Sequence, residues 1–240
     1  MLFRSVDYVL FGFRTITPSL NNLQDEVSFK EQLICSNKEL KNIYVETFLL
    51  SKHGNGFPWN KFYRKSFLKE YNLLFENQRI QQDEVFNLNL YNFLDKAYIS
   101  SEVLYTYYIY EKGNTRVRFI PERFDIYISV REHFEALINR WNLSDPIIEK
   151  YLNQRLYNGI ITCLTYNLFH ADNHWSIDEK KKEIDRIFKN QYSKLAIKNS
   201  YSVTTEQRIY LFFARRKNIF MLSSMIDLFE KLRSIKSQIK

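Results

Sequence analysis

Glycine and proline are scarce in this sequence, at five and four of its 240 residues. So few turn-forming residues disfavour collagen-like repeats, disordered segments and turn-rich β-sandwiches. Hydrophobic residues make up 45% of the chain and aromatic residues 17%, with 20 phenylalanines and 17 tyrosines. The chain can therefore bury a core, and its composition favours helices with a few aromatic strands.

Cysteine and long apolar runs are also lacking. Cys35 and Cys163 are far apart without C-x-x-C spacing, so we expect two reduced core thiols in a reducing compartment. Arg4, Asp7 and Arg14 interrupt the apolar start of the chain, and no cleavage site follows. No apolar run is long enough for a transmembrane helix. These features predict a cytoplasmic protein, either soluble or peripheral on the inner face of the cell membrane.

Acidic residues are outnumbered, with 27 Asp and Glu against 35 Lys and Arg, for a net charge of +8. Such an excess suits an anionic partner, although taken alone it favours a solvated basic surface. Eight basic and three acidic residues lie within 205–240, among many apolar ones. This segment is consistent with a basic helix on an anionic membrane or with a helix packed on the core. No nucleic-acid-binding motif is present, which disfavours a nucleic-acid-binding module.

The first half of the sequence has an α/β pattern. Residues 8–13 form a short apolar run typical of a buried strand, and 97–100 and 103–110 have strand-like aromatic and β-branched content. Ser36 and Glu39 form an S-x-x-E capping box. Helical spacing of apolar residues predicts helices at 37–51, 65–71 and 83–95.

The second half is helical throughout, and the pattern changes near residue 120. Thr204 and Gln207 form a T-x-x-Q capping box before the last helix. Helices are expected near 122–141, 145–169, 177–191 and 205–236. We therefore predict an α/β domain at 1–120 followed by an all-α region at 121–240.

Three short segments carry residues suited to sugar chemistry. Asp83 opens a predicted helix, whose dipole stabilises the carboxylate by ~0.3–1 kcal/mol. An ionised, fixed carboxylate can accept a proton from a sugar hydroxyl, although Asp is also a common N-cap. Trp59 offers a ring for stacking on a sugar face, or it anchors the loop. Lys61 and Arg64 are able to meet phosphate or to serve as surface charge. His53 lies in a loop bracketed by glycines, where it is either functional or exposed without a role.

The order of these segments resembles the second half of bacterial family 2 glycosyltransferases with the GT-A fold. Those enzymes build capsular and other surface polysaccharides. The matching features are Trp59-Asn-Lys-Phe-Tyr-Arg64, the acidic motif at Gln82-Asp83, and the aromatic strand Tyr105-Thr-Tyr107 followed by an Asn-Thr turn. The resemblance covers roughly residues 5–118. Each motif is short, and the ordered set is more specific than any member.

The resemblance implies a fold and a site. The fold class is α/β, a partial GT-A-type mixed sheet followed by an all-α C-terminal region. Asp83 matches the catalytic base and Phe86 the aromatic residue that packs its helix, while Gln82 replaces the usual Glu of the acidic doublet. The substrate-binding residues would be Trp59, Asn60, Lys61, His53, Gln82, Tyr105 and Tyr107.

The donor half expected of this family is missing from the sequence. Family members bind Mg²⁺ or Mn²⁺ with an aspartate-rich D-x-D motif, and no D-x-D occurs here. The partners implied are a nucleotide-sugar donor and a glycan or lipid-linked acceptor. We expect an inverting sugar transferase that is inactive alone because it is truncated. The alternative is a non-catalytic remnant or a partner subunit of a split glycosyltransferase.

Overall fold

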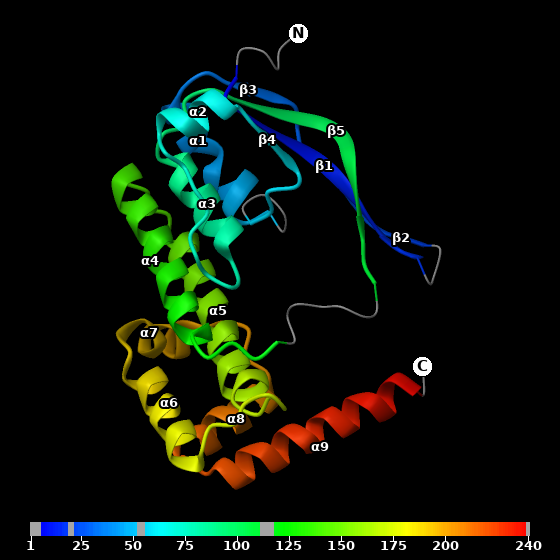
Figure 1. The fold of residues 1–240 in the computed structure, drawn as a ribbon, viewed down its shortest axis with the longest axis vertical. Helices are drawn as coiled ribbons and strands as arrows, with labels where there is room; N and C mark the ends of the chain where they lie inside the picture. The colour runs from blue at the N-terminus through cyan, green and yellow to red at the C-terminus, as the bar shows by residue number, and fades with distance from the viewer. Residues whose placement is uncertain (1–5, 19–21, 52–55, 111–117, 239–240) are drawn as a thin grey trace. The chain divides into compact units, whose positions relative to one another are not determined.

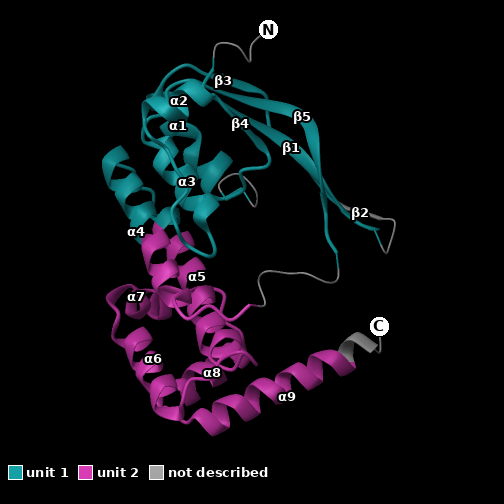
Figure 2. Cartoon of the chain, in the orientation of Figure 1, with its two compact units in different colours: residues 1–114, 132–148 teal, residues 115–131, 149–240 magenta. Residues whose placement is uncertain are grey.

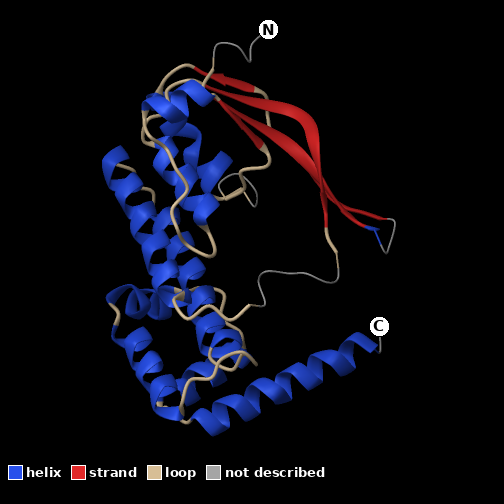
Figure 3. Ribbon diagram, viewed as in Figure 1, coloured by secondary structure: helices blue, strands red, loops and turns tan. Residues whose placement is uncertain are grey.

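The computed structural model describes residues 6–18, 22–51, 56–110 and 118–238, and over these ranges the chain is mixed α/β (Figure 3). The chain divides into two compact units (Figure 2). Unit 1 comprises Met1–Asn114 and Glu132–Ile148, and unit 2 comprises Thr115–Arg131 and Glu149–Lys240. The two units are interleaved along the sequence, because the segment 132–148 groups with unit 1. The domain boundary expected near residue 120 remains a prediction.

Unit 1 is built on a mixed sheet with five strands among its described residues. The strands are β1 (Tyr8–Thr17), β2 (Asn22–Val27), β3 (Gln32–Ile34), β4 (Lys61–Tyr63) and β5 (Ala97–Tyr108). β1 pairs antiparallel with β2 and β4 and parallel with β5, whose start also pairs with β3 (Figure 1). β1 is therefore hydrogen-bonded along both edges and organises the sheet.

The buried strand predicted at 8–13 is confirmed, because β1 is buried without a break from Tyr8 to Phe13 and continues to Thr17. A strand with both faces covered at this end explains the unbroken apolar run. The two strands predicted at 97–100 and 103–110 form one continuous strand, β5.

The join between those two predicted strands coincides with an irregular register. Leu10 pairs with Ile99, but Phe13 pairs with Tyr105, so β5 uses three more residues than β1 over this stretch. Extra residues on one strand bend it and increase its twist, as the curved path of β5 in Figure 1 shows. A bend of this kind interrupts the alternating sequence pattern, which is why two strands were expected.

Three helices complete the first half of unit 1: α1 (Asn37–Ile43), α2 (Lys65–Glu70) and α3 (Gln82–Tyr91). The hydroxyl of Ser36 accepts the Glu39 amide at 3.3 Å, as the capping box predicts, although the Glu39 carboxylate caps the Cys35 amide. The helix expected to reach residue 51 changes after Ile43 into a π-helical segment, Tyr44–Leu49. A ring cluster fills the core between sheet and helices, in which Phe48 and Tyr91 contact each other and both contact Tyr8 and Tyr44.

Two long helices contribute residues to both units, and the helices that follow them in sequence belong to unit 2. The long helices are α4 (Arg123–Trp141) and α5 (Pro146–Thr162). Unit 2 also contains α6 (Ile177–Lys189), α7 (Gln191–Asn199), α8 (Thr205–Arg215) and α9 (Ile219–Gln238). The predicted helices at 122–141 and 177–191 are confirmed, whereas α7 was not predicted.

The helix predicted at 205–236 is two helices. Its capping box is confirmed, with Thr204 and Gln207 exchanging both hydrogen bonds. Lys217 then adopts a left-handed conformation, with φ of 52°, and ends α8. Its amide and the amide of Asn218 donate to carbonyls of the last α8 turn, which satisfies the helix end and redirects the chain.

Cys35 corrects one expectation, because its side chain is exposed rather than in the core; Cys163 is buried, and both thiols are free. Burial raises the pKa of the Cys163 thiol, so it is inert at neutral pH. Among the described residues, no helix combines the length and apolar character needed to span a membrane.

Substitution of Gly12 tests how closely the β1 backbone packs against its neighbours. A Cβ atom at this position would collide with the Val27 carbonyl oxygen and lie 3.2 Å from the Glu102 carbonyl oxygen. Because both neighbours are backbone atoms, they cannot rotate away. We expect Gly12→Ala to lower the free energy of unfolding by about 2 kcal/mol. Urea denaturation measures this change, and Gly56→Ala is the control, since a Cβ at Gly56 meets nothing within 4 Å. Equal effects of the two substitutions would contradict this account.

Candidate functional site

The aromatic residues predicted to form a sugar pocket lie together in unit 1. The Trp59 ring stacks on Tyr105 at a centroid distance of 4.9 Å and on Tyr107 at 5.3 Å. Tyr105 and Tyr107 point to the same face of β5 because they are two residues apart. β5 thus brings the aromatic motif at Tyr105 and Tyr107 onto the motif that begins at Trp59, although the two are more than 40 residues apart in sequence.

The indole of Trp59 is largely engaged by protein rings. Phe57 stacks on it at 4.7 Å, and Phe13 meets it edge-on at 4.7 Å. The tyrosines are more accessible, with 38% of Tyr105 and 42% of Tyr107 exposed. Trp59 is therefore placed to support an aromatic platform, and the tyrosine rings offer the surface that a ligand would reach first.

Lys61 is a buried cation at the first residue of β4. Its side chain donates to the Phe57 carbonyl and, at 2.8 Å, to Asn60 Oδ1, and Asn60 is itself fully buried. Burial lowers the pKa of Lys61 to about 7, while the nearby Asp83 carboxylate opposes that shift. Lys61 is therefore not a surface charge; its hydrogen bonds hold the aromatic loop, and it feels the charge of the carboxylate predicted to be the base.

Asp83 is the second residue of α3 and partly exposed. The N-cap is Gln81, in a left-handed conformation with φ of 59° and no side-chain cap, so Asp83 is not the N-cap itself. One Asp83 oxygen, Oδ1, accepts the Glu84 amide at 3.0 Å. Asp83 lies in the first turn of α3, and its carboxylate interacts electrostatically with the Lys61 side chain.

Two residues that the sequence reasoning missed hold the start of α3 against β4. The Tyr63 hydroxyl donates to Asn87 Oδ1 at 2.8 Å, and Asn87 Nδ2 donates to the Asp83 carbonyl oxygen at 2.9 Å. Burial raises the pKa of Tyr63, which keeps the phenol protonated and able to donate. The signals were the i, i+4 spacing of Asp83 and Asn87 and the alternation of Lys61 with Tyr63.

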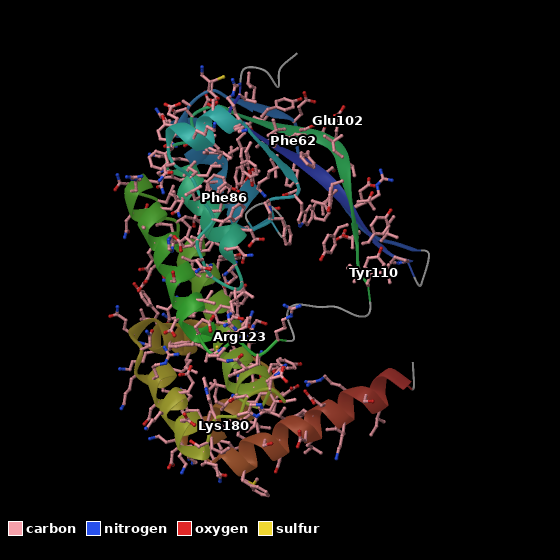
Figure 4. The ribbon with its side chains drawn as sticks, in the orientation of Figure 1. Phe62, Phe86, Glu102, Tyr110, Arg123 and Lys180 are labelled. Atoms are coloured by element: carbon pink, nitrogen blue, oxygen red, sulfur yellow. The ribbon has the colours of Figure 1, made fainter. Side chains whose placement is uncertain are left out.

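Phe86 packs the inner face of α3. Its ring stacks on Phe75 at 4.3 Å and meets Tyr63 edge-on at 5.4 Å. Figure 4 shows Phe86 on the helix side of the sheet, with Phe62 on β4 and Glu102 on β5. The packing role suggested for Phe86 thus has a physical basis in contacts to the same strand that carries Lys61.

The structure adds less about the other residues considered for the site. Gln82 is the first residue of α3 and partly exposed, and His53 lies outside the described residues. Arg64, considered for phosphate, instead forms an ion pair with Asp7 at 3.0 Å and donates to the Val6 carbonyl. Arg64 is therefore committed to holding β4 against the start of β1.

The described residues do not fit a divalent metal. Within residues 6–18, 22–51, 56–110 and 118–238, no three His, Cys, Asp or Glu side chains are grouped to hold an ion. Mg²⁺ and Mn²⁺ prefer several hard oxygen ligands. The ligand set that Mg²⁺ or Mn²⁺ needs is therefore not found in the part of the chain that the structure describes.

No protein-family model matches the chain, and no curated protein matches its sequence. Solved structures similar to it include S. aureus TarS residues 1–349 in complex with UDP-GlcNAc, at 15% identity and a TM-score of 0.47. The match covers 94% of this chain and 60% of that one. The same TarS fragment in complex with UDP has a TM-score of 0.42, at 15% identity, with 94% of this chain and 59% of that one covered. The chain thus spans about three fifths of these relatives, and at these TM-scores the similarity does not by itself assign an activity.

The buried Lys61 predicts a pH-dependent stability. Its pKa falls from 10.5 in the unfolded chain to about 7 in the folded one, so between these values the unfolded state binds more protons. The free energy of unfolding should rise with pH in this window, by up to about 1.4 kcal/mol per pH unit. Lys61→Met should abolish that rise.

Urea denaturation between pH 6 and pH 10 measures the difference in slope. Lys65→Met, at an exposed position, should keep the slope of the unmodified chain. An unchanged slope in Lys61→Met would show that Lys61 is not the buried titrating group.

Proposed function

We propose that this chain carries the acceptor side of a sugar transferase of the family 2 glycosyltransferase type. The observation that carries the proposal is the convergence of its motifs in unit 1. Lys61, two residues from the stacked Trp59, interacts electrostatically with Asp83 at the start of α3. A carboxylate that interacts with a buried lysine, in a motif joined through Trp59 to exposed tyrosine rings, suits a sugar hydroxyl that must be oriented and deprotonated.

In the proposed reaction, an acceptor hydroxyl oxygen attacks the anomeric carbon of the donor sugar. The bond from that carbon to the diphosphate oxygen breaks, and the nucleoside diphosphate leaves with the electron pair. Asp83 accepts the proton of the attacking hydroxyl, and attack opposite the leaving group inverts the anomeric configuration. Tyr105 and Tyr107 would orient the acceptor by ring stacking.

The donor side is proposed to come from outside this chain. A nucleotide-sugar site with its Mg²⁺ or Mn²⁺ would be supplied by a strand–helix region ending in D-x-D, encoded upstream or on a second chain. The chain by itself would then be inactive. The alternative, a non-catalytic remnant, is favoured if no such region exists.

Asp83→Asn tests the base. With the donor-side region supplied, UDP-GlcNAc as the first donor tried and Mn²⁺ added, the substitution should lower kcat about 100- to 10,000-fold. The side chain keeps its shape but loses its proton-accepting oxygen pair, so acceptor binding should be retained. Transfer of labelled sugar measures kcat.

Asp25→Asn is the matched control, because Asp25 is an exposed carboxylate on β2. It should leave transfer unchanged. Full activity of Asp83→Asn would exclude Asp83 as the base. Turnover by the chain without any donor-side region would overturn the proposed division of labour.

We also propose that the C-terminal segment 205–240 contacts an anionic membrane. Three apolar side chains of α9, spaced by four and three residues, are exposed: Leu228 at 46%, Leu232 at 51% and Ile235 at 53%. This spacing places them on one helix face, and Phe220 is exposed at 78% on the same helix. An apolar helix face in a basic segment suits an anionic lipid surface.

Leu228→Ser with Leu232→Ser should reduce binding to phosphatidylglycerol vesicles at least tenfold, because the apolar contact is lost. Co-sedimentation measures the bound fraction, with phosphatidylcholine vesicles as the neutral surface. Leu195→Ser, at an exposed leucine of α7, should have no effect. Vesicle binding that survives the double substitution would exclude this face.

A further inference from the structure

Unit 2 contains a pocket that the sugar-transfer proposal does not use. Helices α6, α7 and α8 surround a pocket of about 550 Å³. Its lining residues are Ile184, Asp185, Phe188, Lys194, Ile197, Lys198 and Arg215. A pocket of this size falls in the range that small-molecule ligands occupy.

The floor of the pocket is apolar. Ile184 is fully buried in the main hydrophobic cluster of unit 2, and Phe188 and Ile197 pack against that cluster while remaining partly exposed. These three side chains come from one face of α6 and the facing side of α7. Binding of a hydrocarbon chain over this floor would be favourable, because it would remove apolar surface from water.

The rim of the pocket is cationic. Lys194 and Lys198 are exposed and one turn apart on α7, so both reach the same side. Arg215, in the last turn of α8, holds its guanidinium 5.7 Å from the Phe188 ring centroid. The rim therefore brings three positive charges together beside the apolar floor.

The acidic residue of the lining does not neutralise this rim. The Asp185 carboxylate accepts a hydrogen bond from Lys217 at 2.7 Å, and that bond lowers the pKa of Asp185. Among the described residues, the ion pairs of unit 2 do not engage Lys194, Lys198 or Arg215. Three cations thus remain available to an anionic ligand.

We propose that this pocket binds a single-chain amphiphile with a phosphate head group, whose chain covers Phe188 and Ile197 above the buried Ile184. Phosphate suits the rim because a guanidinium binds its oxygens in a bidentate fashion and two ammonium groups add point charges. Three cations match a phosphate monoester better than a single carboxylate charge. The inference rests on unit 2 alone, so it survives if the transferase proposal fails.

Isothermal titration calorimetry of the full chain with dodecyl phosphate, below its micelle concentration, tests the pocket. We expect binding at one molecule per chain. Lys194→Ala with Lys198→Ala should weaken it at least tenfold, while Lys181→Ala with Lys182→Ala should leave it unchanged. The control removes two lysine charges from α6 outside the pocket lining, so the net charge of the two variants is the same.

Two further ligands separate the parts of the amphiphile. Inorganic phosphate and dodecanol should each bind at least tenfold more weakly than dodecyl phosphate, because each satisfies only the rim or only the floor. Phe188→Ala should weaken dodecyl phosphate while leaving binding of inorganic phosphate unchanged. Equal affinity for inorganic phosphate, or for dodecanol, would overturn the proposal.

Vesicle binding distinguishes two sources of the head group, a single extracted lipid and an intact bilayer. Binding of monomeric dodecyl phosphate that depends on the lysine pair supports a site for a single extracted lipid. If Lys194 and Lys198 matter only for phosphatidylglycerol vesicles, and monomeric dodecyl phosphate does not bind, the pocket is a bilayer contact and the proposal is wrong. Equal loss in the Lys181/Lys182 variant would show a general charge effect and would likewise overturn it.

Discussion

The pairing of β1 along both of its edges is the constraint on which unit 1 depends. One edge holds β4, which carries Lys61 and Tyr63, and the other holds β5, which carries the two tyrosines. Neither strand pairs with the other, so their relative register is set through β1 alone among the described strands. The closeness of the β1 backbone to Val27 and Glu102 at Gly12 shows how little freedom that register has.

The buried amino group of Lys61 is the polar centre of the candidate site, and burial lowers its pKa to about 7. Burying an ammonium group is unfavourable, and the structure offsets this with the Phe57 carbonyl, the Asn60 amide oxygen and the Asp83 carboxylate. The two hydrogen bonds also fix the conformation of the aromatic loop. Burial of this amine costs stability locally, and its hydrogen bonds to Phe57 and Asn60 reduce that cost.

The polar link through Asn87 extends this arrangement. Tyr63 and Asn87 fix the backbone of Asp83 rather than its carboxylate, so the side chain keeps access to solvent while its helix is held. In unit 2 the balance is different: the pocket between α6, α7 and α8 leaves three cations on its rim, and the Asp185 carboxylate is taken by Lys217. Each unit thus presents charge beside apolar surface, one with a carboxylate and one with cations.

The sequence by itself determined the elements whose signal is local. The apolar run at 8–13, the capping box at Thr204 and the helical spacing before Trp141 each depend on neighbours within a few residues, and each is found in the structure. Tertiary structure decided the burial of Lys61, the stacking of Trp59 on Tyr105, and the exposure of Cys35, because these depend on which distant segments β1 and β5 bring together. The division of the last helix at Lys217 belongs to the same class, since a lysine in a left-handed conformation has no sequence signature and is held by hydrogen bonds to the preceding helix end.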